Sequence, residues 1–248
     1  MNGKSQNDVS LNRTAGQKRV AIITLTWNRL DYTKRMFESM KKGLKGIKYD
    51  HYIIDQGSND GTVDYLKKLY KTRKGFSLTF NKTNVGLSHG YNQALDKIGN
   101  NYDYILHMDN DCEVLSENCL FEIIKIAIAT QDSCLLSPFV EGVGSKMPRI
   151  GQAEVEGHML GLVYHLGGIF TFVPSIIFEH FRYNKDVPLY GGGQDAMLSQ
   201  FSLHNGFALA YVEDLKIMHM DGTGGQTKKY PEYVKEREQL VNVKYKGT

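Results

Sequence analysis

The sequence of 248 residues has few cysteines, no long apolar run and little net charge. Its three cysteines, Cys112, Cys119 and Cys134, form no CxxC pair and leave an odd number, which argues against a disulfide framework or a zinc site. No apolar run approaches the roughly 20 residues that cross a bilayer, and the first residues lack the hydrophobic segment of a signal peptide. A net charge of +3 provides no broad basic surface for nucleic acid. We therefore expect a soluble protein of the cytoplasm, with peripheral membrane association left open.

Residues 1–17 are polar and aperiodic, which predicts a flexible tail before a domain that spans residues 18–248. In the first half of this domain, apolar runs alternate with apolar residues at helical spacing. The predicted strands are 19–26, 52–54, 76–80 and a fourth that ends at Asp109, and a helix follows each of the first three. This alternation predicts right-handed crossovers and a parallel sheet, in which ligands bind at the carboxyl ends of the strands.

The second half is less regular, and residues 141–170 are too rich in glycine to assign. We expect its strands to continue the same sheet, because no repeat or proline-rich linker separates the halves. Glu213 and Asp214 are interpreted as a turn between strands. The fold class is therefore α/β, a single domain with a Rossmann-like, mainly parallel central sheet flanked by helices and with a mixed second half. The predicted elements are a helix over 118–130, a strand over 134–140, a short helix from about Pro174, a helix over 195–204 and a strand over 207–212.

Two carboxylates one residue apart follow the apolar run Tyr104–Met108, in the triplet Asp109-Asn110-Asp111. At the exit of a buried strand they are suited to hold a hard divalent cation against the phosphates of a nucleotide. The triplet alone is weak evidence for a metal site, because most acidic turns are solvated loops. Three other segments that fit the same ligand make it informative.

Motifs in both halves resemble those of family 2 glycosyltransferases, whose fold is called GT-A. In the first half they are TLTWNR (24–29), DQGSNDGT (55–62), NVGLSHGYNQAL (84–95) and HMDND (107–111). In the second half they are LGGIFTFVPSIIF (166–178), YGGGQDAMLS (190–199) and IMHMDG (217–222). Their number and order make the resemblance specific. It implies that about residues 18–115 bind a nucleotide sugar, and that about residues 116–248 bind the acceptor and carry the catalytic base.

The resemblance implies a nucleotide site at the ends of the first strands. Asp55 would accept a hydrogen bond from a pyrimidine N–H, and Asp109 would contact the ribose. Each segment also has a simpler interpretation: Asn28 caps a helix, residues 57–61 form a tight turn, and residues 84–86 cap the next helix. The implied donor-binding residues are Thr24, Thr26, Asn28, Arg29, Asp55, Gly57, Ser58, Asn84, Gly86, Asp109 and Asn110.

The resemblance also implies a metal site and a catalytic base. Asp111 and His219, with Asp109 as a further ligand, would hold Mg²⁺ or Mn²⁺; oxygen ligands favour both ions, and imidazole favours Mn²⁺. The alternative for His219 is a core residue. Asp195 would take the proton of the acceptor hydroxyl, whereas an isolated carboxylate there would only interact with its helix dipole. Gln194 stands where the family commonly has Glu, so no second carboxylate is assigned. The other histidines considered are interpreted as structural: His51, His107, His158, His165, His180 and His204.

The sequence therefore predicts a metal-dependent, inverting glycosyltransferase that moves a hexosyl or pentosyl group from a nucleoside-diphosphate donor, most simply a UDP-sugar, to an acceptor hydroxyl. The acceptor is left open among a glycan, a lipid carrier, a protein and a modified nucleobase, and so is the oligomeric state. Lys228 and Lys229 are candidates to close over the diphosphate, the alternative being solvated surface lysines. An oxidoreductase is disfavoured because TLTWNR has no G-x-G-x-x-G pattern. A non-catalytic nucleotide- or glycan-binding module remains the alternative.

Overall fold

The most apolar of the predicted strands lies inside the sheet. β1 is buried along all seven of its residues and pairs with parallel strands on both sides. The computed structural model describes residues 14–143, 148–186 and 193–222, and the strands in these ranges form one mixed sheet in the order β3-β2-β1-β4-β9-β6-β10-β8-β7, with β5 paired to β10. The strands are β1 (Val20–Thr26), β2 (Tyr49–Asp55), β3 (Phe76–Phe80), β4 (Tyr104–Met108), β5 (Cys112–Val114), β6 (Cys134–Glu141), β7 (Gly151–Val155), β8 (His158–Leu162), β9 (Phe170–Pro174) and β10 (Ala208–His219).

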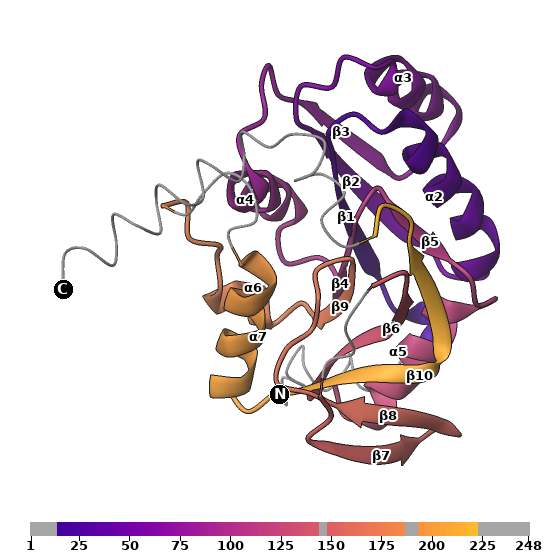
Figure 1. Ribbon diagram of the computed structural model, residues 1–248, viewed down its shortest axis with the longest axis vertical. Helices are drawn as coiled ribbons and strands as arrows, with labels where there is room; N and C mark the ends of the chain where they lie inside the picture. Colours follow the sequence, from indigo (N-terminus) through magenta and orange to yellow (C-terminus); the bar gives the residue numbers. More distant parts are fainter. Residues whose placement is uncertain (1–13, 144–147, 187–192, 223–248) are drawn as a thin grey trace, which may run out of the picture.

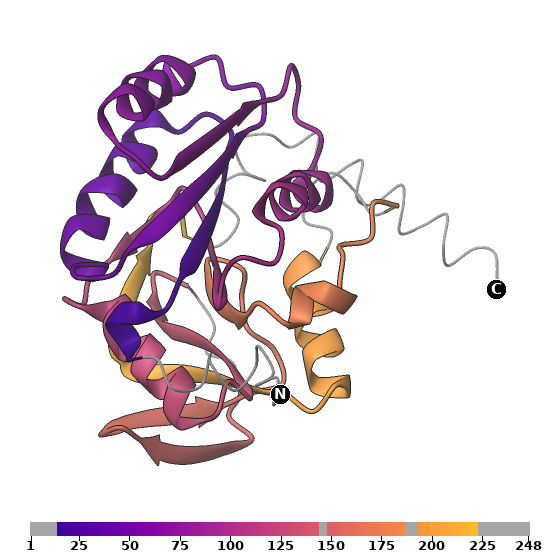
Figure 2. The same cartoon turned by 180° about the vertical axis from the view of Figure 1, so that it is seen from behind.

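Helices cover both faces of the sheet, as the alternating pattern predicts. The helices are η1 (Ala15–Gln17), α2 (Leu30–Gly43), α3 (Thr62–Thr72), α4 (Leu87–Ile98), α5 (Cys119–Ala129), α6 (Ile177–His180) and α7 (Gln194–His204). Buried residues of α2, α3 and α5 belong to the core on one face, and those of α4, α6 and α7 to the core on the other. Figure 1 shows α4, α6 and α7 grouped on one side of the sheet. In both views (Figures 1 and 2), α3 and the β7–β8 hairpin lie at opposite ends of the molecule.

The direction of the strands determines which segments meet. β3, β2, β1 and β4 are parallel, so their carboxyl ends lie at one edge of the sheet. β9 runs antiparallel between β4 and β6, and its first residue, Phe170, pairs with Met108 at the end of β4. The segment that precedes β9 therefore reaches the edge at which the Asp109 triplet begins.

Two expectations for the glycine-rich middle of the chain are revised. Residues 141–170, which were not assigned, contain the β7–β8 hairpin. The short helix predicted from about Pro174 begins at Ile177, because Pro174 is the last residue of β9.

The turn predicted at Glu213 and Asp214 is wrong, since both residues lie inside β10. Val212 pairs with Pro138 of β6, but the next paired residue of β10 is Lys216, so three residues bulge out of the ladder. Pro138 has no N–H to donate at this point, and bulges are the usual way for a strand to pass such a gap. β10 thus continues to His219.

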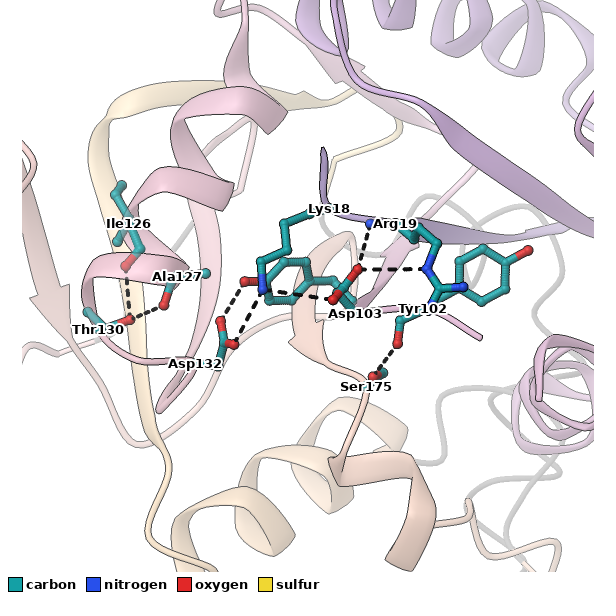
Figure 3. Close-up of polar contacts among 10 residues, drawn as sticks. Lys18, Arg19, Tyr102, Asp103, Ile126, Ala127, Thr130, Asp132 and Ser175 are labelled. Carbon is teal, nitrogen blue, oxygen red and sulfur yellow. Dashed lines mark hydrogen bonds and ion pairs between the residues drawn. The ribbon is translucent and has the colours of Figure 1, made fainter. Parts of the chain in front are cut away.

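The predicted tail, residues 1–17, lies outside the described residues up to position 13. From Thr14 the chain packs on the domain, and the side chain of Lys18 is 0% exposed. Its Nζ lies 3.8 Å from Asp103 Oδ1 and 4.0 Å from Asp132 Oδ2, and Asp132 also accepts a 2.5 Å hydrogen bond from the Tyr104 hydroxyl. Figure 3 shows this cluster at the start of β1. It fixes the amino ends of β1 and β4, opposite the edge that carries the triplet.

Candidate active site

Asp55, the last residue of β2, holds the turn that follows it. The residue is 0% exposed. Its Oδ1 accepts hydrogen bonds from the N–H groups of Gly57 (3.1 Å) and Ser58 (2.9 Å), and its Oδ2 accepts from the hydroxyls of Thr26 (2.9 Å) and Ser58 (2.6 Å). A carboxylate has about four lone-pair sites, and these bonds use them. The base contact predicted for Asp55 therefore requires the release of one of these bonds, and the tight-turn interpretation describes the geometry better.

Thr24 is also turned into the core. Its hydroxyl donates to the carbonyl of Met108 at 2.8 Å and lies 2.8 Å from His51 Nε2. Because the single hydroxyl proton is used by Met108, His51 Nε2 carries the proton of the second bond. The Thr24 side chain, predicted to belong to the donor site, thus joins β1 to β2 and β4 from inside the sheet.

The loops after β1, β2 and β4 are bonded to one another. Asn28 and Arg29 have left-handed backbone conformations, with φ of 57° and 63°. The N–H of Asn28 donates to Ser58 Oγ at 2.7 Å, and its Oδ1 accepts from the N–H of Asn59 at 2.8 Å. Asn110 Nδ2 donates to the carbonyl of Asn28 at 3.3 Å. Asn28, Ser58 and Asn110, which were predicted to bind the nucleotide sugar, therefore lie together, and their contacts shape the loops.

The remaining segment implied to bind the nucleotide sugar, residues 84–86, leads into α4. Gly86 precedes this helix with φ of 84°, and Asn84 Oδ1 accepts its N–H at 2.9 Å. Gln56, which the sequence did not single out, donates from Nε2 to the carbonyl of Gly86 at 3.1 Å. Gly57 has φ of 79°, and a Cβ on it would lie 3.0 Å from the carbonyl oxygen of Lys82. A side chain at Gly57 would therefore both strain and crowd this turn.

The triplet places two carboxylates together at the end of β4. Burial raises the pKa of Asp109 to about 7, and repulsion from Asp111 adds to the shift. Burial also acts to raise the pKa of Asp111, but the hydrogen bond from His219 and the charge of Arg29 outweigh it and hold that pKa below its usual value. Near neutral pH, Asp111 is therefore ionised and Asp109 is partly protonated. A further cation beside Asp109 would relieve this repulsion.

A positive side chain of the protein already lies beside Asp111. Arg29 Nη1 is 2.5 Å from Asp111 Oδ2, and its Nη2 is 2.7 Å from Asp221 Oδ2. His219, the last residue of β10, places Nε2 3.2 Å from the same oxygen of Asp111. Burial acts to lower the pKa of His219, but this hydrogen bond, together with the negative charges of Asp111 and Asp109, outweighs it and raises the pKa. Arg29, predicted to contact the donor, is thus the counter-charge of the triplet.

Asp109, Asp111 and His219 fit a divalent cation in their donor chemistry, two carboxylates and one imidazole. Within the described ranges, however, no three His, Cys, Asp or Glu side chains are gathered closely enough to hold a metal ion. The guanidinium of Arg29 occupies one oxygen of Asp111. A cation bound here would compete with Arg29 for that carboxylate.

One cavity of about 350 Å³ is lined by both Asp109 and Asp195. Tyr91, His107 and Tyr183 also line it. The Tyr91 ring stacks on His107 with centroids 4.5 Å apart, and the Tyr183 hydroxyl lies 3.1 Å from His107 Nδ1. His107, interpreted as structural, therefore belongs to the cavity wall. Its position on β4, two residues before Asp109, was a signal for this, because residues two apart in an extended chain share a face. Tyr183 had no comparable signal.

Asp195 lies in the first turn of α7, while its neighbour Gln194 is buried. Asp195 Oδ1 accepts the N–H of Ala196 at 2.9 Å, and Oδ2 lies 3.3 Å from His165 Nε2. Burial acts to raise the pKa of Asp195, but the hydrogen bond and charge of His165, together with the N–H of Ala196, outweigh it and lower the pKa. Asp195 is therefore a carboxylate at neutral pH, which is the form that a general base requires.

Lys228 and Lys229 lie outside the described residues. Across the ranges that the structure does describe, none of the helices is both long enough and apolar enough to pass through a membrane.

The chain matches the glycosyl transferase family 2 model over residues 21–184. No curated protein sequence matches it. Among solved structures, the mannosyltransferase PcManGT from Pyrobaculum calidifontis, in complex with GDP-Man and Mn²⁺, is similar with a TM-score of 0.65 at 12% identity, over 87% of this chain and 60% of that one. GalNAc-T7 with UDP, GalNAc and Mn²⁺ is similar with a TM-score of 0.68 at 14% identity, over 84% of this chain and 45% of that one. S. aureus TarS 1-349 is similar with a TM-score of 0.63 at 16% identity, over 91% of this chain and 64% of that one.

These similarities, at low identity, show that the fold is that of GT-A glycosyltransferases. The chain belongs to glycosyl transferase family 2, as the motifs predicted. It spans less than two thirds of the length of each of these three proteins.

Proposed function

We propose that the protein is a metal-dependent, inverting glycosyltransferase that moves a sugar from a nucleoside-diphosphate donor to an acceptor hydroxyl. The observation that carries the proposal is the shared cavity: Asp109, on the donor side, and Asp195, on the acceptor side, line the same space of about 350 Å³. A sugar between them would have the donor phosphates on one side and a carboxylate base on the other.

Asp195 is the proposed base. It takes the proton of the acceptor hydroxyl while that oxygen attacks the anomeric carbon from the face opposite the phosphate. The new carbon–oxygen bond forms as the bond to the diphosphate breaks, and the electron pair of the broken bond leaves with the diphosphate. The anomeric configuration is therefore inverted.

Asp111, His219 and Asp109 are the residues that would hold a divalent cation, Mn²⁺ or Mg²⁺. When bound, such an ion neutralises the charge of the leaving diphosphate. The Mn²⁺ in the mannosyltransferase and GalNAc-T7 complexes supports this assignment. Residues Asn28, Gly57, Ser58, Asn84 and Gly86 shape the loops that would receive the nucleotide.

We assign a UDP-sugar as the donor, which agrees with the UDP in the GalNAc-T7 complex and the UDP-GlcNAc bound to S. aureus TarS. The GDP-Man in the mannosyltransferase makes a GDP-sugar the first alternative to test. The acceptor is a hydroxyl of a glycan, a lipid carrier, a protein or a modified nucleobase. The three cysteines are buried free thiols, which is compatible with a reducing compartment such as the cytoplasm.

Calorimetry with UDP- and GDP-sugars, with and without Mn²⁺, identifies the donor, and the release of nucleoside diphosphate then measures turnover with water or candidate glycans as acceptor. We expect Asp195→Asn to bind the donor as the wild type does and to lose about 10²- to 10⁴-fold in turnover. Asp96→Asn, at an exposed carboxylate of α4, is the control and should turn over normally. Donor binding without any turnover in the wild type would instead identify a binding module.

A further inference from the structure

A histidine from outside the cavity contacts the proposed base. His165 lies between β8 and β9, and its Nε2 is 3.3 Å from Asp195 Oδ2. The two side chains are 25% and 36% exposed, so their contact is partly shielded from water. Among the described residues that line the cavity, Asp195 is present and His165 is not. His165 thus contacts the base without belonging to the described wall of the cavity.

The backbone on either side of His165 is held by two hydrogen bonds. The N–H of Val163 donates to the carbonyl of Leu209 at 3.0 Å. The N–H of Leu166 donates to Ser199 Oγ at 3.2 Å, and Ser199 is on the same helix as Asp195. Val163 and Leu166 are buried on either side of the histidine. The position of His165 relative to α7 is therefore built into the fold, and the contact does not depend on a free loop.

The two oxygens of Asp195 have different partners. Oδ1 accepts the N–H of Ala196, and Oδ2 faces His165. A carboxylate held by one backbone bond alone can rotate about its Cβ–Cγ bond, whereas a second donor fixes the plane of the group. Fixing that plane matters because a base acts efficiently only when its oxygen is within hydrogen-bond reach of the proton, and an error of about 1 Å in position can reduce the rate on the order of a hundredfold.

We propose that His165 is a positioning residue: its Nε2–H donates to Asp195 Oδ2 and holds the carboxylate at the angle that takes the acceptor proton. This inference rests on the proposed function, in which Asp195 is the base. His165 does not touch the sugar and takes no proton from it. Its contribution is to the orientation of Asp195, so its loss lowers turnover without weakening donor binding.

The test compares two substitutions of His165 that differ in their ability to donate a hydrogen bond. His165→Gln keeps an N–H donor close to the place of Nε2, and His165→Leu removes the donor but retains much of the volume. With the UDP-sugar that binds and with Mn²⁺, and with water as acceptor, His165→Leu should lower kcat by about tenfold to a hundredfold and leave the donor KM and the calorimetric Kd of UDP unchanged. His165→Gln should stay within about threefold of the wild type. His204→Leu, at the far end of α7, removes a histidine from an exposed position and is the control.

A double substitution separates positioning from general damage. In an Asp195→Asn background, His165→Leu should cause no further loss, because the histidine acts through Asp195. If His165→Leu does not fold, His165→Asn replaces it, since its amide is too short to reach Oδ2. An active wild type with an unchanged kcat in His165→Leu, or a further loss in the Asp195→Asn background, overturns this inference alone. A wild type that binds UDP-sugars and never releases UDP overturns the proposed function and this inference with it.

Discussion

Substituting His51 by glutamine should remove part of the acid sensitivity of the fold. His51 is fully buried in β2, and the ring centres of Phe37 and Phe76 are 5.5 Å and 5.4 Å from its own. Its Nε2–H donates to Thr24, and its Nδ1 has no hydrogen-bond partner within the part of the chain that the structure describes. Protonation would place a charge and a second N–H in an apolar site. Burial, with a smaller contribution from the charge of Arg73, lowers the pKa of His51 to about 3.

The size of the effect follows from the two pKa values. The unfolded chain, in which the His51 pKa is about 6.5, takes up a proton as the pH falls below that value, and the folded protein does not do so until about pH 3. The stability that neutral His51 contributes is therefore complete above pH 6.5 and is lost progressively between these values. At pH 5 the loss is about 2 kcal/mol, from about 1.5 pH units at about 1.4 kcal/mol each. This is a large part of a typical stability of about 5 to 15 kcal/mol.

Urea unfolding at pH 7 and pH 5 measures the effect. The fall in the free energy of unfolding between the two pH values should be about 2 kcal/mol larger in the wild type than in His51→Gln. Ile53→Val, two residues further along β2, is the control: it removes a buried methyl group and should lower stability by about 1 kcal/mol equally at both pH values. An identical fall in the wild type and in His51→Gln would refute the role assigned to the buried imidazole.

Three further substitutions test other parts of the structure. Lys18→Met removes a buried cation from between Asp103 and Asp132 and should destabilise the protein by about 3 kcal/mol in urea, whereas Lys41→Met, which breaks an exposed pair with Glu38, should change stability by less than about 1 kcal/mol. Gly43→Ala places a Cβ 2.3 Å from Val114 Cγ1 and should cost about 1 to 3 kcal/mol; Val114→Ala in the same chain should recover part of that loss, and no recovery would contradict the proposed clash. Arg29→Met frees Asp111 from the guanidinium and should tighten Mn²⁺ binding by about tenfold in calorimetry of the protein alone; weaker binding would show that Arg29 does not compete with the ion.

The parallel half of the fold could be predicted from the sequence because its strands are continuous apolar runs and its helices carry apolar residues at helical spacing. The apolar run 20–26 and the helical spacing of Met36, Phe37 and Met40 are local signals, and local signals also placed the triplet at the end of a strand. The β7–β8 hairpin could not be assigned, because β7 has few apolar residues and Gly161 interrupts the apolar run of β8. β9 was not predicted, because its apolar run is only five residues long and follows directly on the glycine-rich segment. The turn expected at Glu213 was wrong because the bulge depends on Pro138, a residue 75 positions away in the sequence.

The residues of the candidate site could be proposed from the sequence, but their contacts could not. The resemblance placed Asp109 in the nucleotide-binding half and Asp195 in the acceptor-binding half, and the structure has both lining one cavity. The hydrogen bonds that saturate Asp55 could not be predicted, because an acidic residue before a glycine turn has the same sequence whether it faces a ligand or the turn. His165 carried no signal, since its contact with Asp195 joins two segments that only the folding of β9 and α7 brings together.

The backbone bond between the two sides of the cavity has a consequence for the order in which substrates bind. The N–H of Asp109 donates to the carbonyl of Ile169 at 2.9 Å, and Ile169 is four residues from His165. We therefore expect a ligand that shifts the backbone at Asp109 to act, through this hydrogen bond, on the segment that carries His165, which contacts Asp195. Donor and acceptor are then expected to bind cooperatively rather than independently. By thermodynamic reciprocity, the factor by which the donor changes the affinity for the acceptor equals the factor by which the acceptor changes the affinity for the donor.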